Sequence, residues 1–340
     1  MYKKILVIRF SSIGDIILTT PVVRALKEKF KDASVDILLK KEFSDIYADS
    51  PYVDNVIRFD SKKHNSITKL LSFSKKLKKN DYDLVIDLHR NLRSFIIRRN
   101  LNANKVLCYN KDILKRRLLV AFKIRFDNMP HVVDRYLEPL KEIGIENADR
   151  TPTISLSEKD VEFSDRFFEE NGVQPDTKTI ALFPGAKNRA KMYPIEKFAN
   201  LIGMITSRLK ANVIIIGGNS DEKIISDLTG RISDMNLVST FLSNSLKQSG
   251  SIVKKCDAVI TNDSGPMHLS VAVGTRVIAL FGPTDERFGF YPLGKDDVVL
   301  TKGYKCSPCS LHGKKDCIKY DYKCLNDISE EEIVTNLALN

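Results

Sequence analysis

Asp15 lies in a polar loop between an apolar run and a helical pattern, a position where a carboxylate has two uses. Residues 4–10 predict a strand, and a helix is expected from about residue 16 to residue 30. In open α/β sheets, ligands bind where strands end and helices begin. Asp15 is therefore either a helix N-cap or a general base. The small residues Ser11 and Gly14 would let a ligand approach the backbone closely.

A second loop of this kind follows the apolar residues 179–183. It contains Pro184 and Gly185, and Lys191 lies a few residues on, within a run of cations. A cation beside such a loop suits a diphosphate, whose charge grows as a nucleotide departs. The alternative interpretation is a solvated basic loop. Glu222 follows a Gly-Gly pair after another apolar run, where it is either part of a helix cap or a partner for a ribose hydroxyl.

The densest polar cluster spans residues 261–268, after an apolar run and before the small-residue helical stretch 269–273. Backbone N–H groups at a helix N-terminus bind anions, so this segment predicts a sugar-diphosphate site. His268 alone would more often be a packed core histidine. Thr284 follows the next predicted strand and is expected at the same edge of the sheet. The candidate donor contacts here are Asp263, Ser264, Gly265, Met267, His268 and Thr284.

Four cysteines near the C-terminus form the metal-like pattern of the sequence. Cys306, Cys309, Cys317 and Cys324 are spaced C-x2-C-x7-C-x6-C. In a reducing compartment such a group favours zinc over disulfides. The spacing differs from the two C-x2-C pairs of a zinc ribbon, so free structural thiols remain the alternative. A G-x-G-x-x-G fingerprint and a P-loop motif are both absent from the sequence.

Short apolar runs alternate with helical patterns, which predicts an α/β fold of two Rossmann-like domains. A polar, turn-rich stretch near residues 150–157 indicates the boundary, giving domains 1–157 and 158–340. We expect the last helix, 329–339, to pack back on the N-terminal domain. The predicted strands are 4–10, 35–39, 53–59, 84–88, 179–183, 212–216, 237–239, 258–261 and 276–281. The main predicted helices are 16–30, 159–171, 195–209, 220–232 and 329–339.

The charge of the chain is concentrated in one region. The net charge is +11 over 340 residues, and residues 61–125 alone carry 18 basic and 4 acidic side chains. Such local basicity indicates an anionic partner: nucleic acid, an anionic membrane or a phosphorylated substrate. A solvated face is the alternative. Amphipathic basic helices are expected around residues 67–77 and 113–126. The apolar runs are too short to span a bilayer and no secretory signal is recognisable, so we expect a cytoplasmic protein.

Taken together, the loop segments resemble the family 9 glycosyltransferases, the lipopolysaccharide heptosyltransferases. The resemblance lies in residues 5–15 with Thr20-Pro21, then 184–186, 190–194, 263–268 and 281–285. The Ala-Lys-x-aromatic-Pro stretch is similar to enzymes that add a second heptose, although Tyr193 stands where those usually have Trp. Many family members also have a cysteine-bearing segment near the C-terminus, which favours a structural role for the four cysteines.

The resemblance implies a GT-B fold, with a central cleft between an N-terminal acceptor domain and a C-terminal donor domain. It implies an inverting, metal-independent transfer of heptose from ADP-heptose to the inner core of lipopolysaccharide, onto Kdo-lipid A or a first heptose. Asp15 would be the general base, Lys191 would stabilise the leaving diphosphate, and no cofactor would be required. The other donor contacts would be Ser11, Gly14, Pro184, Gly185, Glu222 and the cluster from Asp263 to Thr284.

The same resemblance implies an acidic, phosphorylated glycolipid as acceptor, which accounts for the basic first half. His89, Arg90 and Arg93 are candidate acceptor contacts. We expect a monomer that associates peripherally with the inner face of the cytoplasmic membrane. A GT-B enzyme using another sugar nucleotide is the first alternative. A nucleic-acid-binding protein is the second, and the sequence lacks the motifs that it would need.

Overall fold

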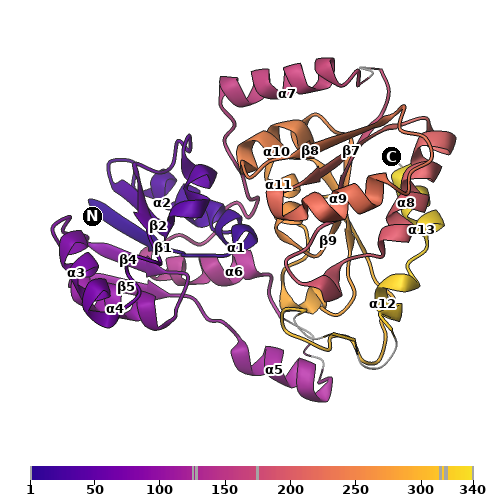
Figure 1. The fold of residues 1–340 in the computed structure, drawn as a ribbon. Helices are drawn as coiled ribbons and strands as arrows, with labels where there is room; N and C mark the ends of the chain where they lie inside the picture. The colour runs from indigo at the N-terminus through magenta and orange to yellow at the C-terminus, as the bar shows by residue number, and fades with distance from the viewer. Residues whose placement is uncertain are drawn as a thin grey trace. The chain divides into compact units, whose positions relative to one another are not determined.

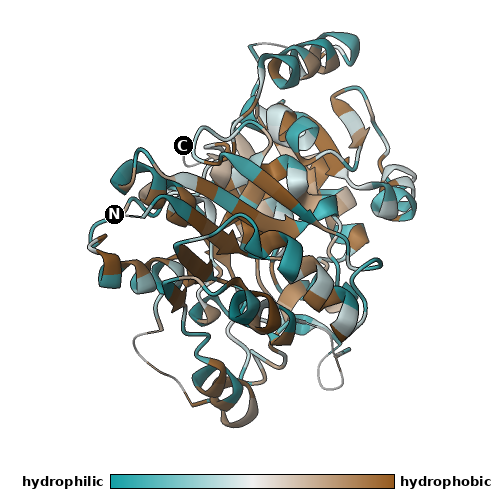
Figure 2. Ribbon diagram, turned by 90° about the vertical axis from the view of Figure 1, so that its left-hand side faces the viewer, coloured by the Kyte–Doolittle hydropathy of each residue, from teal (hydrophilic) through white to brown (hydrophobic). Residues whose placement is uncertain are grey.

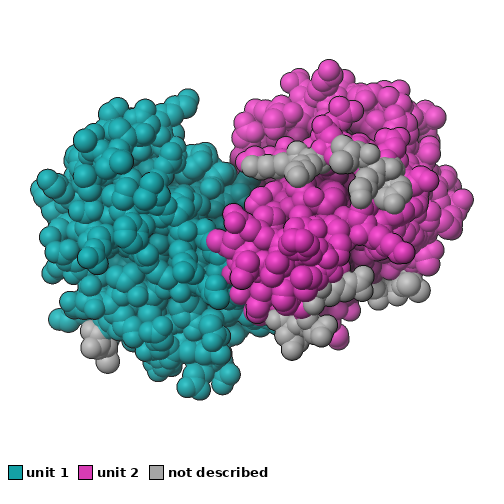
Figure 3. Space-filling view, turned by 90° about the horizontal axis from the view of Figure 1, so that it is seen from below, with its two compact units in different colours: residues 1–111, 132–155 teal, residues 112–131, 156–340 magenta. Residues whose placement is uncertain are grey.

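The structure is a computed structural model that describes residues 2–124, 126, 129–173, 176–313, 316–317 and 321–338. The chain divides into two compact units (Figures 1 and 3). Unit 1 consists of residues 1–111 and 132–155, and unit 2 of residues 112–131 and 156–340. Each unit is built on a parallel sheet, so the α/β class and the two Rossmann-like halves expected from the sequence are confirmed. In the described part of the chain, none of the helices combines the length and apolar character needed to cross a bilayer.

The sheet of unit 1 has the strand order β3-β2-β1-β4-β5, with parallel neighbours. Parallel strands are covered on both faces, which explains the continuous apolar run at residues 5–8, all fully buried. The strand β5 was not predicted, because it is short and only partly buried. The strands are β1 (Lys4–Ile8), β2 (Ser34–Lys40), β3 (Asn55–Phe59), β4 (Leu84–Asp87) and β5 (Lys105–Cys108).

The helix predicted over residues 16–30 is two helices in the structure, α1 (Ile13–Ile17) and α2 (Thr20–Lys29). Pro21 explains the break, since a proline lacks the N–H that would bond to the carbonyl of Ile17 and crowds that carbonyl. The Oγ1 of Thr20 donates to this carbonyl instead, at 2.8 Å. Unit 1 also contains η1 (Lys41–Tyr47), α3 (Ile67–Lys78), α4 (Leu92–Leu101), α6 (Val132–Leu137) and η2 (Glu138–Ile143).

The sheet of unit 2 has the order β11-β10-β9-β6-β7-β8, again with parallel neighbours. Its side chains alternate between two apolar clusters: Ile180 and Leu182 belong to one, and Ala181 and Phe183 to the other. Figure 2 shows the hydrophobic residues along the strands in brown. The strands are β6 (Thr179–Phe183), β7 (Asn212–Gly217), β8 (Val238–Leu242), β9 (Ala258–Asn262), β10 (Arg276–Leu280) and β11 (Val298–Leu300).

Helices of unit 2 bury their apolar sides against these two clusters or, for the helix that holds Met267 and Val271, in a third cluster with Phe281. They are α7 (Glu158–Glu170), α8 (Ile195–Met204), α9 (Glu222–Thr229), α10 (Leu246–Lys254), α11 (Gly265–Ala272), α12 (Lys323–Asn326) and α13 (Glu330–Ala338), with short turns η3 (Arg189–Lys191), η4 (Ile205–Leu209), η5 (Asn219–Asp221) and η6 (Glu286–Phe288).

The last helix, α13, packs its apolar residues within unit 2. Ile333, Val334 and Leu337 lie in the core cluster of unit 2 that also holds residues of α8. Its apolar stripe is therefore buried in the core of unit 2, and the expected packing on the N-terminal domain stays a prediction. Leu339, the last residue of the predicted helix, lies outside the described residues.

The helix α5 (Ile113–Phe122) belongs to unit 2, although the sequence boundary placed it in the N-terminal domain. The guanidinium of Arg116 lies over the rings of Phe288 and Phe290, at 5.3 and 5.4 Å from their centroids. The ring of His131 bonds to the carbonyl of Tyr291, at 3.0 Å. These contacts reach segments 160 or more residues away in the chain, which local sequence patterns do not encode. The main boundary lies at residues 155–156, two residues from the predicted one.

Candidate functional site

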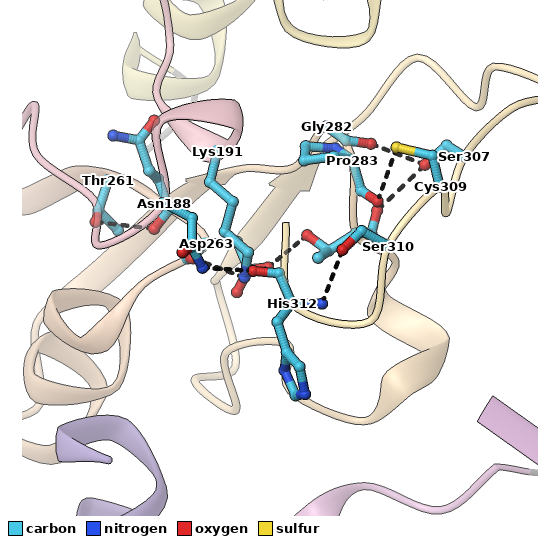
Figure 4. A network of polar contacts seen from close by, with 12 residues as sticks. Asn188, Lys191, Thr261, Asp263, Gly282, Pro283, Ser307, Cys309, Ser310 and His312 are labelled. Carbon is cyan, nitrogen blue, oxygen red and sulfur yellow. Dashed lines mark hydrogen bonds and ion pairs between the residues drawn. The ribbon is translucent and has the colours of Figure 1, made fainter. Parts of the chain in front are cut away.

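Lys191 and Asp263 meet at one edge of the unit 2 sheet (Figure 4). The hydroxyl of Thr284 reaches the same carboxylate. The Nζ of Lys191 lies 2.6 Å from Oδ2 of Asp263, and the Oγ1 of Thr284 donates to the same oxygen at 2.5 Å. The three follow β6, β9 and β10, whose carboxyl ends lie side by side because the strands are parallel neighbours. The side chains of Lys191 and Asp263 are only 15% and 11% exposed. The structure thus brings together three residues that the sequence singled out separately.

Asn262 joins the loops of this edge, and sequence reasoning missed it. Its Nδ2 donates to the carbonyl of Pro184 at 2.9 Å, and its Oδ1 accepts the backbone N–H of Tyr193 at 2.9 Å. Asn262 is fully buried and so holds the Pro184–Gly185 loop against the end of β9. An amide at the last position of an apolar strand was the available signal.

Ser264 caps the helix α11 without using its hydroxyl. It is the N-cap residue, its side chain makes no capping bond, and its buried Oγ has no hydrogen-bond partner among the described residues. Gly265 is the first residue of the helix, so free N–H groups lie beside this hydroxyl. Buried polar groups are normally hydrogen-bonded, so an unpartnered hydroxyl at a helix N-terminus is a candidate for contact with a ligand.

Met267 and His268, which also belong to the predicted donor segment 261–268, are buried like core residues. Met267 is fully buried in a cluster with Val271 and Phe281, and His268 is 5% exposed. The ring of His268 packs edge-on against Phe290. Donor contacts by these two side chains remain predictions.

The loops after β6 and β7 approach each other around Asp221. A Cβ added at Gly185 would lie 2.6 Å from Oδ1 of Asp221, and one at Gly217 would lie 2.9 Å from its Cβ. Only glycine allows this close approach. Glu222, predicted as the ribose partner, is exposed at the start of α9. Asp221 is a further carboxylate beside the predicted donor loop.

The four C-terminal cysteines are free thiols. Burial raises the pKa of Cys324 to about 11, and the neighbouring Cys309, Cys306 and Cys317 add to the rise. The four sulfurs therefore lie within electrostatic range of one another. Across the described residues, however, no group of three or more His, Cys, Asp or Glu side chains is arranged to hold a metal ion.

The cysteine-bearing loop 306–313 is bonded to the Lys191 site (Figure 4). The Oγ of Ser307 donates to the carbonyl of Gly282 at 2.8 Å, and the N–H of Cys309 donates to that of Pro283 at 3.0 Å. The Nδ2 of Asn188 donates to the carbonyl of His312 at 2.6 Å. This loop therefore forms a wall of the site.

In unit 1, Asp15 has partners on both carboxylate oxygens. Its Oδ1 lies 2.6 Å from Nη2 of Arg9 and accepts a bond from the hydroxyl of Tyr136 at 3.3 Å. Its Oδ2 accepts from the Oγ and the N–H of Ser12, at 2.7 and 3.1 Å. Ser12 is the N-cap of α1, so Asp15 completes the cap from within the first turn and is not itself the N-cap.

These partners fix the charge of Asp15. Burial alone would raise the pKa of this carboxyl, but the charge of Arg9 and the bonds from Ser12 outweigh it and lower the pKa to about 2. The side chain is 20% exposed, so it is an anion within reach of solvent. Ser11 lies in the loop before α1, and the Nε of Arg9 donates to its carbonyl at 3.0 Å. Gly14 is a buried residue in the first turn of α1.

Cations gather at the carboxyl ends of β1, β4 and β5. The Nη1 of Arg90 donates to the carbonyl of Tyr109 at 3.0 Å. Burial and the charges of Arg9 and Arg90 lower the pKa of Lys111. Burial, then the charges of Arg9 and Lys111, also lower the pKa of His89 to about 3, so that this ring is neutral at pH 7. Its Nδ1 is buried and has no partner among the described residues.

The loop before α4 is shaped by Asp87, whose Oδ1 accepts the N–H groups of His89 and Arg90 at 3.0 and 2.7 Å. This orients both predicted acceptor residues at the edge of the sheet. Arg93 is exposed in the first turn of α4. Arg9, Lys111 and Tyr136 were not predicted as site residues, although the position of Arg9 directly after the apolar run 5–8 was a usable signal for this cation.

The sequence matches a known family over most of its length. Residues 70–318 match the family model "Glycosyltransferase family 9 (heptosyltransferase)". The chain is 27% identical to lipopolysaccharide heptosyltransferase 3 of Escherichia coli strain K12 over 284 residues, covering 81% of each chain. It is also 27% identical to lipopolysaccharide heptosyltransferase 1 of Campylobacter coli over 343 residues, covering 97% of each.

Solved structures agree on the fold. The family 9 glycosyl transferase of Veillonella parvula superposes with a TM-score of 0.82 at 24% identity, covering 98% of this chain and 96% of the other. An E. coli heptosyltransferase solved with ADP-2-deoxy-2-fluoro heptose superposes with a TM-score of 0.69 at 19% identity, covering 98% of each chain.

The fold and the family match define a glycosyltransferase of the GT-B class. The chain belongs to glycosyltransferase family 9, as its loop motifs indicated.

Proposed function

We propose that this enzyme transfers heptose from ADP-heptose to the inner core of lipopolysaccharide, with inversion at the anomeric carbon. The observation that carries the proposal is the Lys191–Asp263–Thr284 contact beside the unpartnered hydroxyl of Ser264. Relatives named as lipopolysaccharide heptosyltransferases support the sugar and the pathway, and a structural neighbour solved with an ADP-heptose analogue supports the nucleotide.

On the donor side, Lys191 would neutralise the diphosphate as the bond from the anomeric carbon to its oxygen breaks. Asp263 holds the ammonium at 2.6 Å and so positions it before the donor arrives. The hydroxyl of Ser264 and the N–H groups at the start of α11 would bind the phosphates or the sugar. Pro184, Gly185, Glu222, Met267, His268 and Thr284 complete the proposed donor contacts.

A cation and a helix N-terminus together supply the charge that a divalent metal supplies in other transferases. We therefore propose that no metal and no other cofactor is required. Undiminished transfer after dialysis against a chelator is the expected result, and loss that added Mg²⁺ restores would contradict this part of the proposal.

In unit 1, Asp15 would take the proton of the acceptor hydroxyl as its oxygen bonds to the anomeric carbon and the ADP leaves from the opposite side. Since the pKa of Asp15 is about 2, the carboxylate is ready as an anion but has a weak affinity for a proton. An acceptor hydroxyl has to replace one of its partners. Tyr136 makes the longest of these contacts, 3.3 Å, and is the one we expect to give way.

For the acceptor, we propose an acidic, phosphorylated glycolipid at the inner face of the cytoplasmic membrane, bound by an enzyme that is monomeric. Arg9, Arg90 and Lys111 gather positive charge at the edge of the unit 1 sheet. The neutral ring of His89 can bond to a sugar hydroxyl. Arg93 remains a candidate further along α4. The relatives are named heptosyltransferase 1 and heptosyltransferase 3, and we propose either Kdo-lipid A or a core that already carries heptose as the acceptor.

A donor and acceptor screen with the purified full-length protein tests the proposal. We expect release of ADP from ADP-heptose only when a lipopolysaccharide core acceptor is present, with the new linkage inverted by NMR. Activity with a UDP-sugar and none with ADP-heptose would overturn the choice of donor. Tight, salt-sensitive binding of duplex DNA or RNA without any sugar-nucleotide binding would overturn the enzyme assignment itself.

A further inference from the structure

One side of the helix α5 packs against the rest of unit 2. Leu119 is 1% exposed, and Arg116 stacks over the rings of Phe288 and Phe290. Just after the helix, the Nζ of Lys123 donates to the carbonyl of Cys306 at 2.8 Å and to that of Pro308. These contacts fix the orientation of the helix about its own axis.

The opposite side of α5 exposes large apolar side chains. Leu114 is 70% exposed and Phe122 is 71% exposed, and Ile113 and Ile124 next to them are 48% and 44% exposed. Leu114, Leu118 and Phe122 follow one another at four-residue spacing and so share one stripe. Exposed apolar side chains that gather on one helix mark an interaction surface.

Basic side chains border this stripe. Lys115 and Arg117 are exposed on the same helix, and residues 113–124 contain no acidic residue. An apolar stripe bordered only by cations is complementary to a bilayer with anionic headgroups, because the apolar side chains enter the acyl boundary while the cations remain among the phosphates. A protein groove would require acidic side chains at each of these points.

We propose that the outward face of α5 docks this enzyme on the surface of an anionic lipid bilayer. The proposal refines the proposed function, because it names the element that brings the enzyme to its glycolipid acceptor. It places the membrane contact in unit 2, on a helix that lies apart from the sheet of that unit (Figure 1).

The anchors of α5 connect it to the donor site. Lys123 is bonded to the two carbonyls that flank Ser307. Ser307 donates in turn to the carbonyls of Gly282 and Thr284, at 2.8 and 3.3 Å, and Thr284 donates to Asp263. A bilayer bound at α5 is therefore linked through this chain of bonds to the edge of the sheet where we propose that the donor binds.

The test measures sedimentation of the full-length protein with vesicles of phosphatidylcholine containing phosphatidylglycerol. We expect the double variant Leu114→Glu/Phe122→Glu to bind these vesicles at least about tenfold more weakly, because it places two charges in the docking stripe. Lys115→Gln/Arg117→Gln should weaken binding by about fivefold for each cation removed, and only at low salt.

Val161→Glu on α7 is the matched control. It changes another apolar side chain that is 42% exposed, and it should leave vesicle binding unchanged. All variants should keep ADP affinity and turnover with a water-soluble, delipidated core acceptor. If the Glu variant unfolds, Leu114→Ser/Phe122→Ser tests the same stripe without introducing charge.

Three results would overturn the inference: a wild type that does not sediment with anionic vesicles, equal sedimentation of the double variant, or a wild-type dimer in solution that the double variant abolishes. The last would show that a second copy of the chain covers the stripe. Vesicle binding that depends on α5 in a protein without ADP-heptose activity would keep this inference and reject the proposed function.

Discussion

The Nη2 of Arg9 lies 2.6 Å from Oδ1 of Asp15, and this ion pair sets the charge state of the proposed base. Arg9 is itself buried at 7% exposure and also donates to the carbonyl of Leu88, so it is held firmly in place. A carboxylate in such a contact is ionised throughout the physiological pH range. The pair therefore provides an anion at a fixed position, and the acceptor has to compete with existing partners for it.

Replacing Asp15 with Asn keeps the shape of the side chain and removes the base. We expect kcat for transfer to fall by about 10²-fold or more, because a positioned base contributes a factor of that order. ADP affinity, measured by calorimetry, should stay within about twofold. Near-normal turnover by Asp15→Asn would remove this residue from the chemical step.

The same pair makes a pH-dependent contribution to stability. The pKa of Asp15 is lowered from 3.8 to about 2 on folding, so its contribution is fully present above pH 4 and is lost as the pH falls towards 2. We expect the wild type to lose about 2 kcal/mol of its stability advantage over Asp15→Asn across this range. Urea unfolding of both proteins between pH 5 and pH 2 measures it. A stability advantage that does not change with pH would mean that the pKa of Asp15 is the same in the folded and the unfolded protein.

Lys191→Ala should weaken ADP-heptose binding and reduce kcat by about 10²-fold, because it removes the cation beside the leaving diphosphate. Lys187→Ala is the matched control, since Lys187 is an exposed cation on the same loop. Equal effects of the two substitutions on kcat would show that the loop contributes only general positive charge.

Gly313 leaves room for the stem of Lys191. A Cβ at Gly313 would lie 2.6 Å from Cγ of Lys191, and the residue has a φ of +65°. Gly313→Ala should therefore displace Lys191 and weaken ADP affinity by about fivefold or more. Gly303→Ala is the control, because Gly303 has a similar φ of +58° with nothing within 4 Å of the added Cβ. Both variants bear the backbone strain, so only a difference between them reports on Lys191.

The four C-terminal thiols should differ in reactivity. Because burial and neighbouring thiols raise the pKa of Cys324 to about 11, we expect it to alkylate more slowly than Cys306 at pH 8, as measured by mass spectrometry of labelled peptides. Metal analysis of the same sample decides the alternative left by the sequence. One equivalent of zinc that protects all four cysteines would show that they are metal ligands.

Much of the fold follows from local patterns. Runs such as residues 5–8 and 180–183 are apolar on every side chain because parallel strands are covered on both faces. Glycines and small residues after those runs then indicate which loops lie at ligand-binding edges. The short, half-buried β5 escaped prediction because it carries little of this pattern.

The α/β class, the loops and most of the residues at them follow from local sequence patterns, because each depends on neighbours within a few positions. The three-dimensional fold was needed to show that Asp15 pairs with Arg9 and Tyr136, that Lys191 is held by Asp263, and that α5 belongs to unit 2. These contacts join segments that are distant in the chain or depend on how side chains turn. Packing selects them, and no local periodicity encodes them.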